Sequence, residues 1–244
     1  MTPKISIVSI KNPRNWHWFL MLLMVPFTIS CLDMDDEGLE NPPTAYVSFY
    51  NGAGTDNGIR IEVDEKYYDR TPFDFGQYID YWYFFTGERN FSFTIPGTGG
   101  QVLDTAVTLK VDEAYSFFMA NEEGELKTLF VEDSLALPQS GKATFRLVNL
   151  SSDAPAVNLF KRDTAEPLIE AQDFMDITDF TSLDIGQTDL ILKSADGDSE
   201  LGRLNDVTIR EGRIYTLIVR GQMGAPDNSE EALRLQLIRN YPNY

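Results

Sequence analysis

The chain has 244 residues, of which 38 are acidic and 20 basic, and its formal net charge is −18 at pH 7. A surface this acidic repels phosphate backbones, so we expect no nucleic-acid partner. Cys31 is the only cysteine, so no disulfide can form within one molecule. His17 is the only histidine.

Residues 1–30 have the parts of a secretory signal peptide. Lys4, Lys11 and Arg14 give a positively charged start, and no acidic residue precedes Asp33. The apolar segment 16–29 follows, and it is shorter than the roughly 20 residues that a membrane-spanning helix needs. We therefore interpret residues 1–30 as a signal peptide rather than an anchor helix.

The signal ends in Thr28-Ile29-Ser30-Cys31, which resembles the lipobox of bacterial lipoproteins, where a small residue precedes the cysteine that is acylated. Ser30 and Cys31 fit this pattern, whereas Thr28 and Ile29 depart from it. The resemblance implies lipid attachment at Cys31, by acyl chains such as palmitate, and anchoring to the membrane without a transmembrane helix. The alternative is an ordinary cleaved signal with an incidental thiol.

Residues 31–43 read as an acidic tether that ends in two prolines. The acidic run is similar to the signal that sends some lipoproteins to the outer leaflet of the outer membrane; the alternative is a solvated spacer. We expect an outer membrane lipoprotein at the cell surface, with a periplasm-facing location as the alternative. Without residues 1–30, 17 basic residues remain against 38 acidic ones, a charge of −21, and His17 is lost.

The rest of the chain shows the alternation of short β-strands. Apolar residues recur at every second position, which indicates strands with one buried face; examples are Phe91, Phe93 and Ile95, then Ala143, Phe145 and Leu147, then Leu233, Leu235 and Leu237. Clusters of Gly, Asn, Asp and Pro separate these runs and favour turns. We see no amphipathic run of helical length and therefore predict an all-β fold.

The strand pattern occurs twice, about 100 residues apart. Residues 45–51 align with 143–149, residues 107–111 with 207–211, and residues 115–119 with 215–219. Each copy is long enough for a sandwich with its own core. We predict two tandem immunoglobulin-like antiparallel β-sandwich domains, residues 44–138 and 142–244, joined by a short segment.

The first copy contains an aromatic stretch at residues 78–85, Tyr-Ile-Asp-Tyr-Trp-Tyr-Phe-Phe. Tyr81, Trp82 and Tyr83 form a candidate ligand platform, because aromatic rings on a rigid sheet stack on sugars or pack against proteins. Alternate residues of a strand face inward, however, so core packing competes with both readings.

The second copy opens with Ala-Thr-Phe-Arg-Leu-Val-Asn-Leu-Ser-Ser-Asp-Ala-Pro-Ala-Val-Asn-Leu-Phe at residues 143–160. This resembles the opening signature of the domain of unknown function 4397 family, and residues 185–186 and 212–221 resemble its later turn and closing strand. Ser152 and Asn158 depart from the family pattern, and residues 45–135 look like a diverged copy. The resemblance implies an exported or surface protein with immunoglobulin-like sandwiches, and it supplies no catalytic residue.

Few reactive groups remain in the mature chain. The loss of His17 and acylation of Cys31 remove His- and Cys-based nucleophiles and metal sites, and carboxylate pairs occur by chance among 38 acids. Asp196, Asp198 and Glu200 could bind Ca²⁺, but they lack the pattern of an EF-hand loop and fit a polar hairpin turn. We expect no enzyme activity, no cofactor and no metal.

These observations predict a non-enzymatic, surface-exposed lipoprotein that binds or scaffolds an extracellular partner. The alternative is a glycan-binding accessory lipoprotein of an uptake system, with the aromatic residues near Trp82 as its platform. The partners expected are the membrane, through Cys31, and a surface protein or a glycan.

Overall fold

The computed structural model describes residues 42–68, 71–97, 102–197 and 199–240. The signal peptide, Cys31 and the tether as far as Asn41 lie outside these residues. Within the described ranges, no helix is long and apolar enough to cross a membrane.

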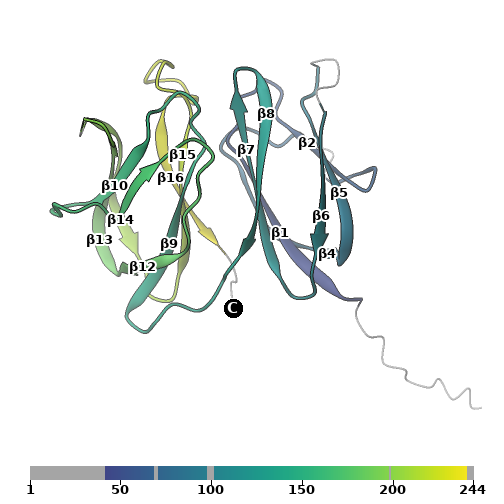
Figure 1. Ribbon diagram of the computed structural model, residues 1–244, viewed down its shortest axis with the longest axis horizontal. Coiled ribbons are helices and arrows are strands. Elements are labelled where there is room, and N and C mark those ends of the chain that lie inside the picture. The colour runs from purple at the N-terminus through teal and green to yellow at the C-terminus, as the bar shows by residue number, and fades with distance from the viewer. Residues whose placement is uncertain (1–41, 69–70, 98–101, 198, 241–244) are drawn as a thin grey trace, which may run out of the picture. The chain divides into compact units, whose positions relative to one another are not determined.

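The described residues form sixteen strands and no helix, which confirms the all-β prediction (Figure 1). In the first sandwich, one sheet has the order β4-β1-β7-β8 and the other β3-β2-β5-β6. The first sheet contains β4 (Tyr78–Phe85), β1 (Thr44–Asn51), β7 (Ala114–Glu122) and β8 (Glu125–Asp133). The second contains β3 (Lys66–Tyr67), β2 (Arg60–Val63), β5 (Gly87–Thr94) and β6 (Val102–Leu109).

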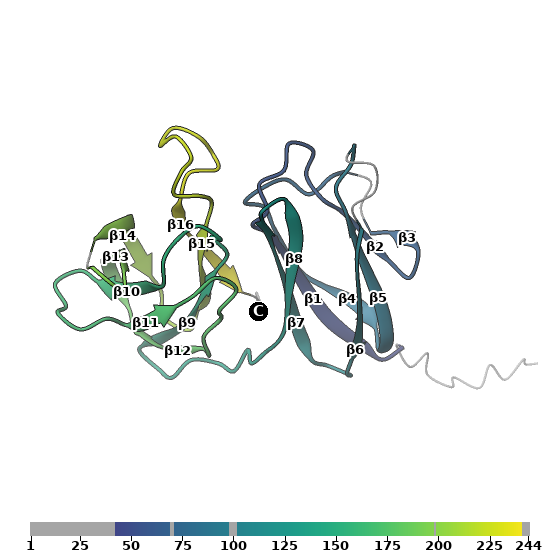
Figure 2. The same cartoon turned by 45° about the horizontal axis from the view of Figure 1, so that its top comes forward.

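The second sandwich repeats this topology, with sheets ordered β12-β9-β15-β16 and β11-β10-β13-β14. The first of these contains β12 (Thr181–Asp184), β9 (Lys142–Asn149), β15 (Ile214–Arg220) and β16 (Arg234–Asn240). The other contains β11 (Ile169–Gln172), β10 (Val157–Lys161), β13 (Gly186–Ser194) and β14 (Glu200–Ile209). The short strands β3 and β11 occupy the same edge position in these sheet orders, and Figure 2 labels both of them.

Each sandwich contains one parallel pair of strands among its antiparallel pairs. Strand β1 runs parallel to β7, with Tyr46 beside Ala114, and β9 runs parallel to β15, with Thr144 beside Ile214. The antiparallel neighbour then places Asp133 beside Ala114 and Asn240 beside Ile214. This shared register defines which residues of the two copies are equivalent.

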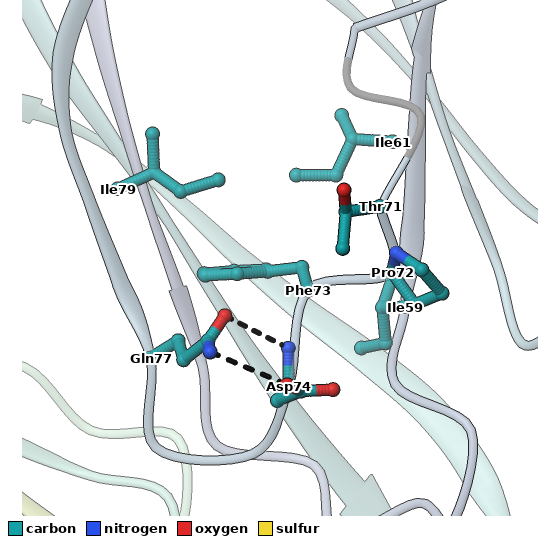
Figure 3. A pocket seen from close by; sticks show the side chains of 8 residues that line it. All are labelled: Ile59, Ile61, Thr71, Pro72, Phe73, Asp74, Gln77 and Ile79. Atoms are coloured by element: carbon teal, nitrogen blue, oxygen red, sulfur yellow. Dashed lines mark hydrogen bonds between the residues drawn. The ribbon is translucent and has the colours of Figure 1, made fainter.

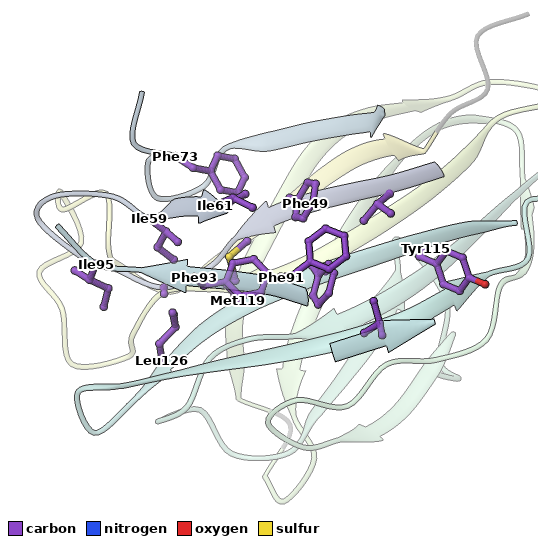
Figure 4. Close-up of a cluster of buried hydrophobic side chains, with 14 of the residues drawn as sticks. Phe49, Ile59, Ile61, Phe73, Phe91, Phe93, Ile95, Tyr115, Met119 and Leu126 are labelled. Atoms are coloured by element: carbon purple, nitrogen blue, oxygen red, sulfur yellow. The ribbon is translucent and has the colours of Figure 1, made fainter. Parts of the chain in front are cut away.

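The core of the first sandwich is rich in aromatic side chains, as Figure 4 shows. Phe49 stacks on Phe117 with ring centroids 5.7 Å apart, and Phe91 and Phe93 contact the same Phe117 ring at 4.9 and 5.1 Å. Phe91, Phe93 and Ile95 are all buried. The period of two therefore predicted the inward face of β5 correctly.

The core of the second sandwich is mainly aliphatic. Ala143, Phe145 and Leu147 of β9 are buried in it, Leu235 of β16 joins them, and Leu233 and Leu237 pack against the same cluster. Strand β16 starts at Arg234, and no helix precedes it in residues 230–233. Both sandwiches belong to one compact unit, Pro42–Tyr244.

Candidate functional site

The outward faces of sheets β4-β1-β7-β8 and β12-β9-β15-β16 pack against each other through a third apolar cluster. Its buried members come from both copies: Tyr50, Phe118 and Ala120 from the first, and Val148, Leu150, Ile218 and Ile238 from the second. The hydroxyl of Tyr50 also donates a 2.7 Å hydrogen bond to Oε1 of Gln236. These sheets are therefore buried on both faces, and the two sandwiches share a core.

A buried polar network lies beside this cluster. Arg146 donates through Nη1 to Oδ1 of Asp133 at 2.5 Å, through Nη2 to Ser116 at 3.2 Å, and through Nε to Thr216 at 3.0 Å. The hydroxyl of Ser116 donates to Asp133 at 2.5 Å and that of Thr216 to Asn240 at 2.6 Å. The side chains of Arg146 and Asp133 are only 3% and 0% exposed, so the network joins the copies by a desolvated ion pair.

The members of the network occupy equivalent positions in the two repeats. By the register of the strands, Ser116 in the first copy is equivalent to Thr216 in the second, and Asp133 is equivalent to Asn240. Ser48 pairs with Ser116, and Arg146 pairs with Thr216, so Ser48 and Arg146 are equivalent as well. Ser48 and Ser116 are linked by a 2.7 Å hydrogen bond. The two copies therefore contact each other through the same three positions of the repeat. Arg146 and Asp133 are the charged side chains among these six residues.

Aromatic rings cover the Arg146 guanidinium. The rings of Phe180 and Phe118 lie 4.5 and 5.3 Å from its central carbon, within the range of cation–π attraction. A cavity of about 420 Å³ adjoins it, lined by Val131, Glu132, Ser134, Arg146, Ile177, Thr178, Asp179 and Phe180. The hydrogen bonds of Arg146 go to protein groups, so the guanidinium serves the junction between the sandwiches.

Tyr81, the first residue of the expected platform, belongs to this network. Its hydroxyl donates to Oδ2 of Asp133 at 2.5 Å and accepts from Nδ2 of Asn240 at 3.0 Å. Burial, and then the negative charge of Asp133, raises the pKa of Tyr81 above its ordinary value. The ring therefore acts between the sandwiches and not on an open surface.

Trp82 and Tyr83 are exposed but do not form one surface with Tyr81. Trp82 is 56% exposed and meets Tyr68 edge-on, with ring centroids 5.6 Å apart. Tyr83 is 69% exposed and lies opposite Tyr46 of β1. Because neighbouring residues of a strand point to opposite faces, Trp82 lies on the other face from Tyr81 and Tyr83. Tyr81 is held in the buried network, so the three predicted residues do not form a flat platform.

A second cavity, of about 280 Å³, opens in the first sandwich (Figure 3). Its wall combines apolar residues, Ile59, Ile61, Pro72, Phe73 and Ile79, with the polar residues Thr71, Asp74 and Gln77. At its mouth Gln77 accepts a 3.1 Å hydrogen bond from the amide of Asp74 and returns one of 3.3 Å to its carboxylate. The polar groups at this cavity thus bond to each other.

The acidic turn that was considered for Ca²⁺ lies in the β13–β14 hairpin. Asp196 accepts a hydrogen bond from Ser194, Glu200 pairs with Arg203, and Asp198 lies outside the described residues. Among the described residues, no group of three or more His, Cys, Asp or Glu side chains could hold a metal ion.

Sequence reasoning missed the junction between the sandwiches. Ser48, Ser116, Arg146 and Thr216 occupy the alternate strand positions that face away from each core, where polar residues usually meet water. One feature of the sequence could have indicated the junction. Each of these polar residues is followed two positions later, on the same outward face of its strand, by an apolar residue: Tyr50, Phe118, Val148 and Ile218. An apolar outward face indicates that a sheet packs against a further layer.

Residues 45–160 match the family model described as "Domain of unknown function (DUF4397)". This match bears out the resemblance to DUF4397. It includes residues 143–160, the opening signature, and nearly the whole first sandwich, where a diverged copy was expected, whereas residues 185–186 and 212–221, which also carried the resemblance, lie outside it. The DUF4397 match therefore crosses from the first sandwich into β10 of the second.

Comparison with solved structures gives a distant similarity to a protein titled "Crystal structure of CBMbc (family CBM26) from Eubacterium rectale Amy13K in Complex with Maltoheptaose". The sequence identity is 12%, the TM-score is 0.25, and the alignment covers 82% of this chain and 98% of that one. A similarity at this level transfers no ligand to this chain. No curated protein sequence matches the chain.

Proposed function

We propose that this protein is an exported, non-enzymatic lipoprotein that is anchored through Cys31 and displays its double sandwich at the cell surface, where it binds or scaffolds an extracellular partner. The signal-like residues 1–30 and the lipobox-like sequence before Cys31 support the location. The absence of any histidine after residue 17 supports a role without imidazole chemistry.

The observation that carries the binding role is the exposed indole of Trp82 on the edge strand β4. Trp82 is 56% exposed, although burying such a ring is strongly favourable. Tryptophan is enriched at protein interfaces, where it supplies much of the binding energy. The neighbouring Tyr81 is fixed by Asp133 and Asn240, so β4 presents this ring from a firmly held strand.

Cell fractionation tests the location. Cys31→Ser should move the protein from the membrane fraction to the soluble fraction, whereas the control Ser30→Ala keeps a small residue before the cysteine and should leave the protein in the membrane. A protease added to intact cells should degrade the wild-type protein if it is at the surface. Unchanged membrane retention of Cys31→Ser would contradict the anchor, and protection from the protease would contradict surface display.

A glycan is the second candidate ligand, and the position of Trp82 favours it. The indole is more than half exposed, while its contact with Tyr68 fixes its orientation. A fixed, exposed ring can stack on the face of a sugar. A glycan array tests this function: Trp82→Ala should abolish any binding, whereas Met223→Ala, at a similarly exposed site in the β15–β16 loop, should not. Absence of binding, or equal binding by both variants, removes this candidate.

A further inference from the structure

Exposed apolar side chains are concentrated at one end of the double sandwich. Nine large apolar side chains are exposed among the described residues. Six of them lie at the end where β1 begins, here called the β1 end: Tyr46, Tyr83, Phe85, Val111, Leu137 and Ile185. Of the other three, Trp82 lies opposite Val47 near this end but on the other face of β4, and the remaining two are Tyr67 and Met223.

Strand pairing places four of the six at the β1 end of the first sandwich. Phe85 lies opposite Thr44, the first residue of β1, and Tyr83 lies opposite Tyr46. Val111 precedes Asp112, whose amide donates a 2.8 Å hydrogen bond to the carbonyl of Thr44. Tyr46, Tyr83 and Phe85 are therefore neighbours on one face, with Val111 in the turn beside them.

Leu137 and Ile185 extend this end to the second sandwich. Leu137 lies in the segment that connects the end of β8 to the start of β9, and Ile185 follows Asp184, which pairs with Lys142 at the start of β9. The ion pair of Asp133 with Arg146 and the bond between Tyr81 and Asn240 join the copies near these same strand ends. Both starts, β1 and β9, thus lie at the lower edge in Figure 1.

The chain enters the fold at this end. The carbonyl of Pro43 accepts a 3.2 Å hydrogen bond from the amide of Thr86, next to Phe85. Only residues 32–43 separate Cys31 from Thr44, and twelve residues span at most about 40 Å when fully extended. An acylated Cys31 would therefore keep the β1 end close to a bilayer surface at high effective concentration.

Part of the acidic charge at this end is paired with lysines. From Pro42 onward there are 17 basic and 33 acidic residues, which an anionic bilayer would repel. At the β1 end, Lys110 pairs with Glu132 at 2.8 Å and Lys142 with Asp184 at 2.5 Å, while Asp112 and Glu113 lie in the same turn as Val111. Tyrosine rings favour the boundary between apolar chains and water.

We infer that the β1 end lies on the membrane and that these exposed side chains enter the lipid headgroup layer. This contact rests on the proposed anchor at Cys31 and adds a second, non-covalent attachment to it. It orients the molecule: the loops of the opposite end, which include Met223, face away from the membrane.

A fluorescent probe tests the orientation, because an acylated Cys31 leaves an introduced cysteine as the only free thiol. The acylated, full mature protein would carry Val111→Cys or Met223→Cys, two positions with similar exposures of 53% and 48%. Each is labelled with an environment-sensitive dye and mixed with phosphatidylcholine vesicles that contain a lipid with a nitroxide on its headgroup. We expect blue-shifted emission and quenching by the nitroxide at position 111, and neither effect at position 223.

The outcomes separate this inference from the anchor. Protein that floats with the vesicles while both dyes remain in water overturns the membrane contact and leaves the anchor intact. Protein that does not float overturns both. A blue shift at position 111 without nitroxide quenching would mean that a protein surface, such as a second copy, covers this end, and it too overturns the inference. Leu137→Cys, at the most exposed of the six positions, repeats the test without altering a strand.

Discussion

Asp133 at the end of β8 and Arg146 in β9 form an ion pair 2.5 Å long between the two sandwiches, with both side chains almost completely removed from water. They are only thirteen positions apart in the chain, yet they belong to different repeats. Each makes further hydrogen bonds, to Ser116 and Tyr81 in the case of Asp133 and to Ser116 and Thr216 in the case of Arg146. This ion pair and its hydrogen bonds connect the two sandwiches through buried side chains.

Removing one partner of this ion pair should be more harmful than replacing both. Arg146→Met leaves the Asp133 carboxylate buried without its cation, and we expect it to lower the free energy of unfolding by about 3–5 kcal/mol. The double variant Asp133→Leu with Arg146→Met should recover much of this loss, because no unpaired charge remains. Urea unfolding measures both, and a double variant as unstable as the sum of the single variants would contradict this account.

Alkaline titration should separate two groups among the 11 tyrosines. Burial raises the pKa of Tyr50, Tyr78 and Tyr81 above the ordinary value of about 10. Their neutral forms therefore stabilise the fold below that pH, and this contribution is lost as pH rises above it, because the unfolded chain then ionises first. Tyrosinate absorbance should show these three ionising only on unfolding. Ionisation of all tyrosines in the folded protein near the ordinary pKa would contradict the burial.

Acid should weaken the second sandwich through Asp189 in β13. A hydrogen bond from Arg162, followed by one from the backbone amide of Asp206, lowers the pKa of Asp189 below its ordinary value. Its contribution to stability is therefore present above about pH 3.9 and is lost as pH falls through the lowered value. Asp189→Asn should reduce the acid dependence of the urea midpoint, whereas the exposed control Asp163→Asn should not. Parallel pH profiles for wild type and Asp189→Asn would exclude this role.

Gly221 should tolerate no side chain, for a steric reason beyond its backbone angle. Its φ is +86°, and an added Cβ would lie 2.4 Å from the carbonyl oxygen of Ala232 and 2.5 Å from that of Glu231. Gly212 has a similar φ of +69° but no atom within 4 Å of the same position. Gly212→Ala should cost about 1 kcal/mol of unfolding free energy from backbone strain alone, and Gly221→Ala several kcal/mol. Equal losses in thermal or urea unfolding would show that the close approach is unimportant.

The strand alternation was the most informative sequence feature. It predicted the inward faces around Phe91, Phe145 and Leu235 because burial against a core requires a period of two wherever a strand has one apolar face. The repeat predicted the shared topology, because equivalent strands carry equivalent patterns. The candidate platform was less predictable: alternation separates Trp82 from its neighbours, but it does not distinguish a tyrosine in water from one that bonds a buried carboxylate, as Tyr81 does.

The sequence by itself determined that this chain is all-β and duplicated, that it resembles DUF4397 at residues 143–160, and that its mature part lacks imidazole. These properties depend on residue types and on spacings within or between copies. Only the tertiary structure decided that Ser48, Ser116, Asp133, Arg146 and Thr216 meet in a dry network and that Tyr81 joins them. A polar residue at an outward strand position looks the same in sequence whether it faces water or another sheet. Packing of the two sandwiches excludes water from these polar groups, and hydrogen bonds between the copies take the place of hydrogen bonds to water.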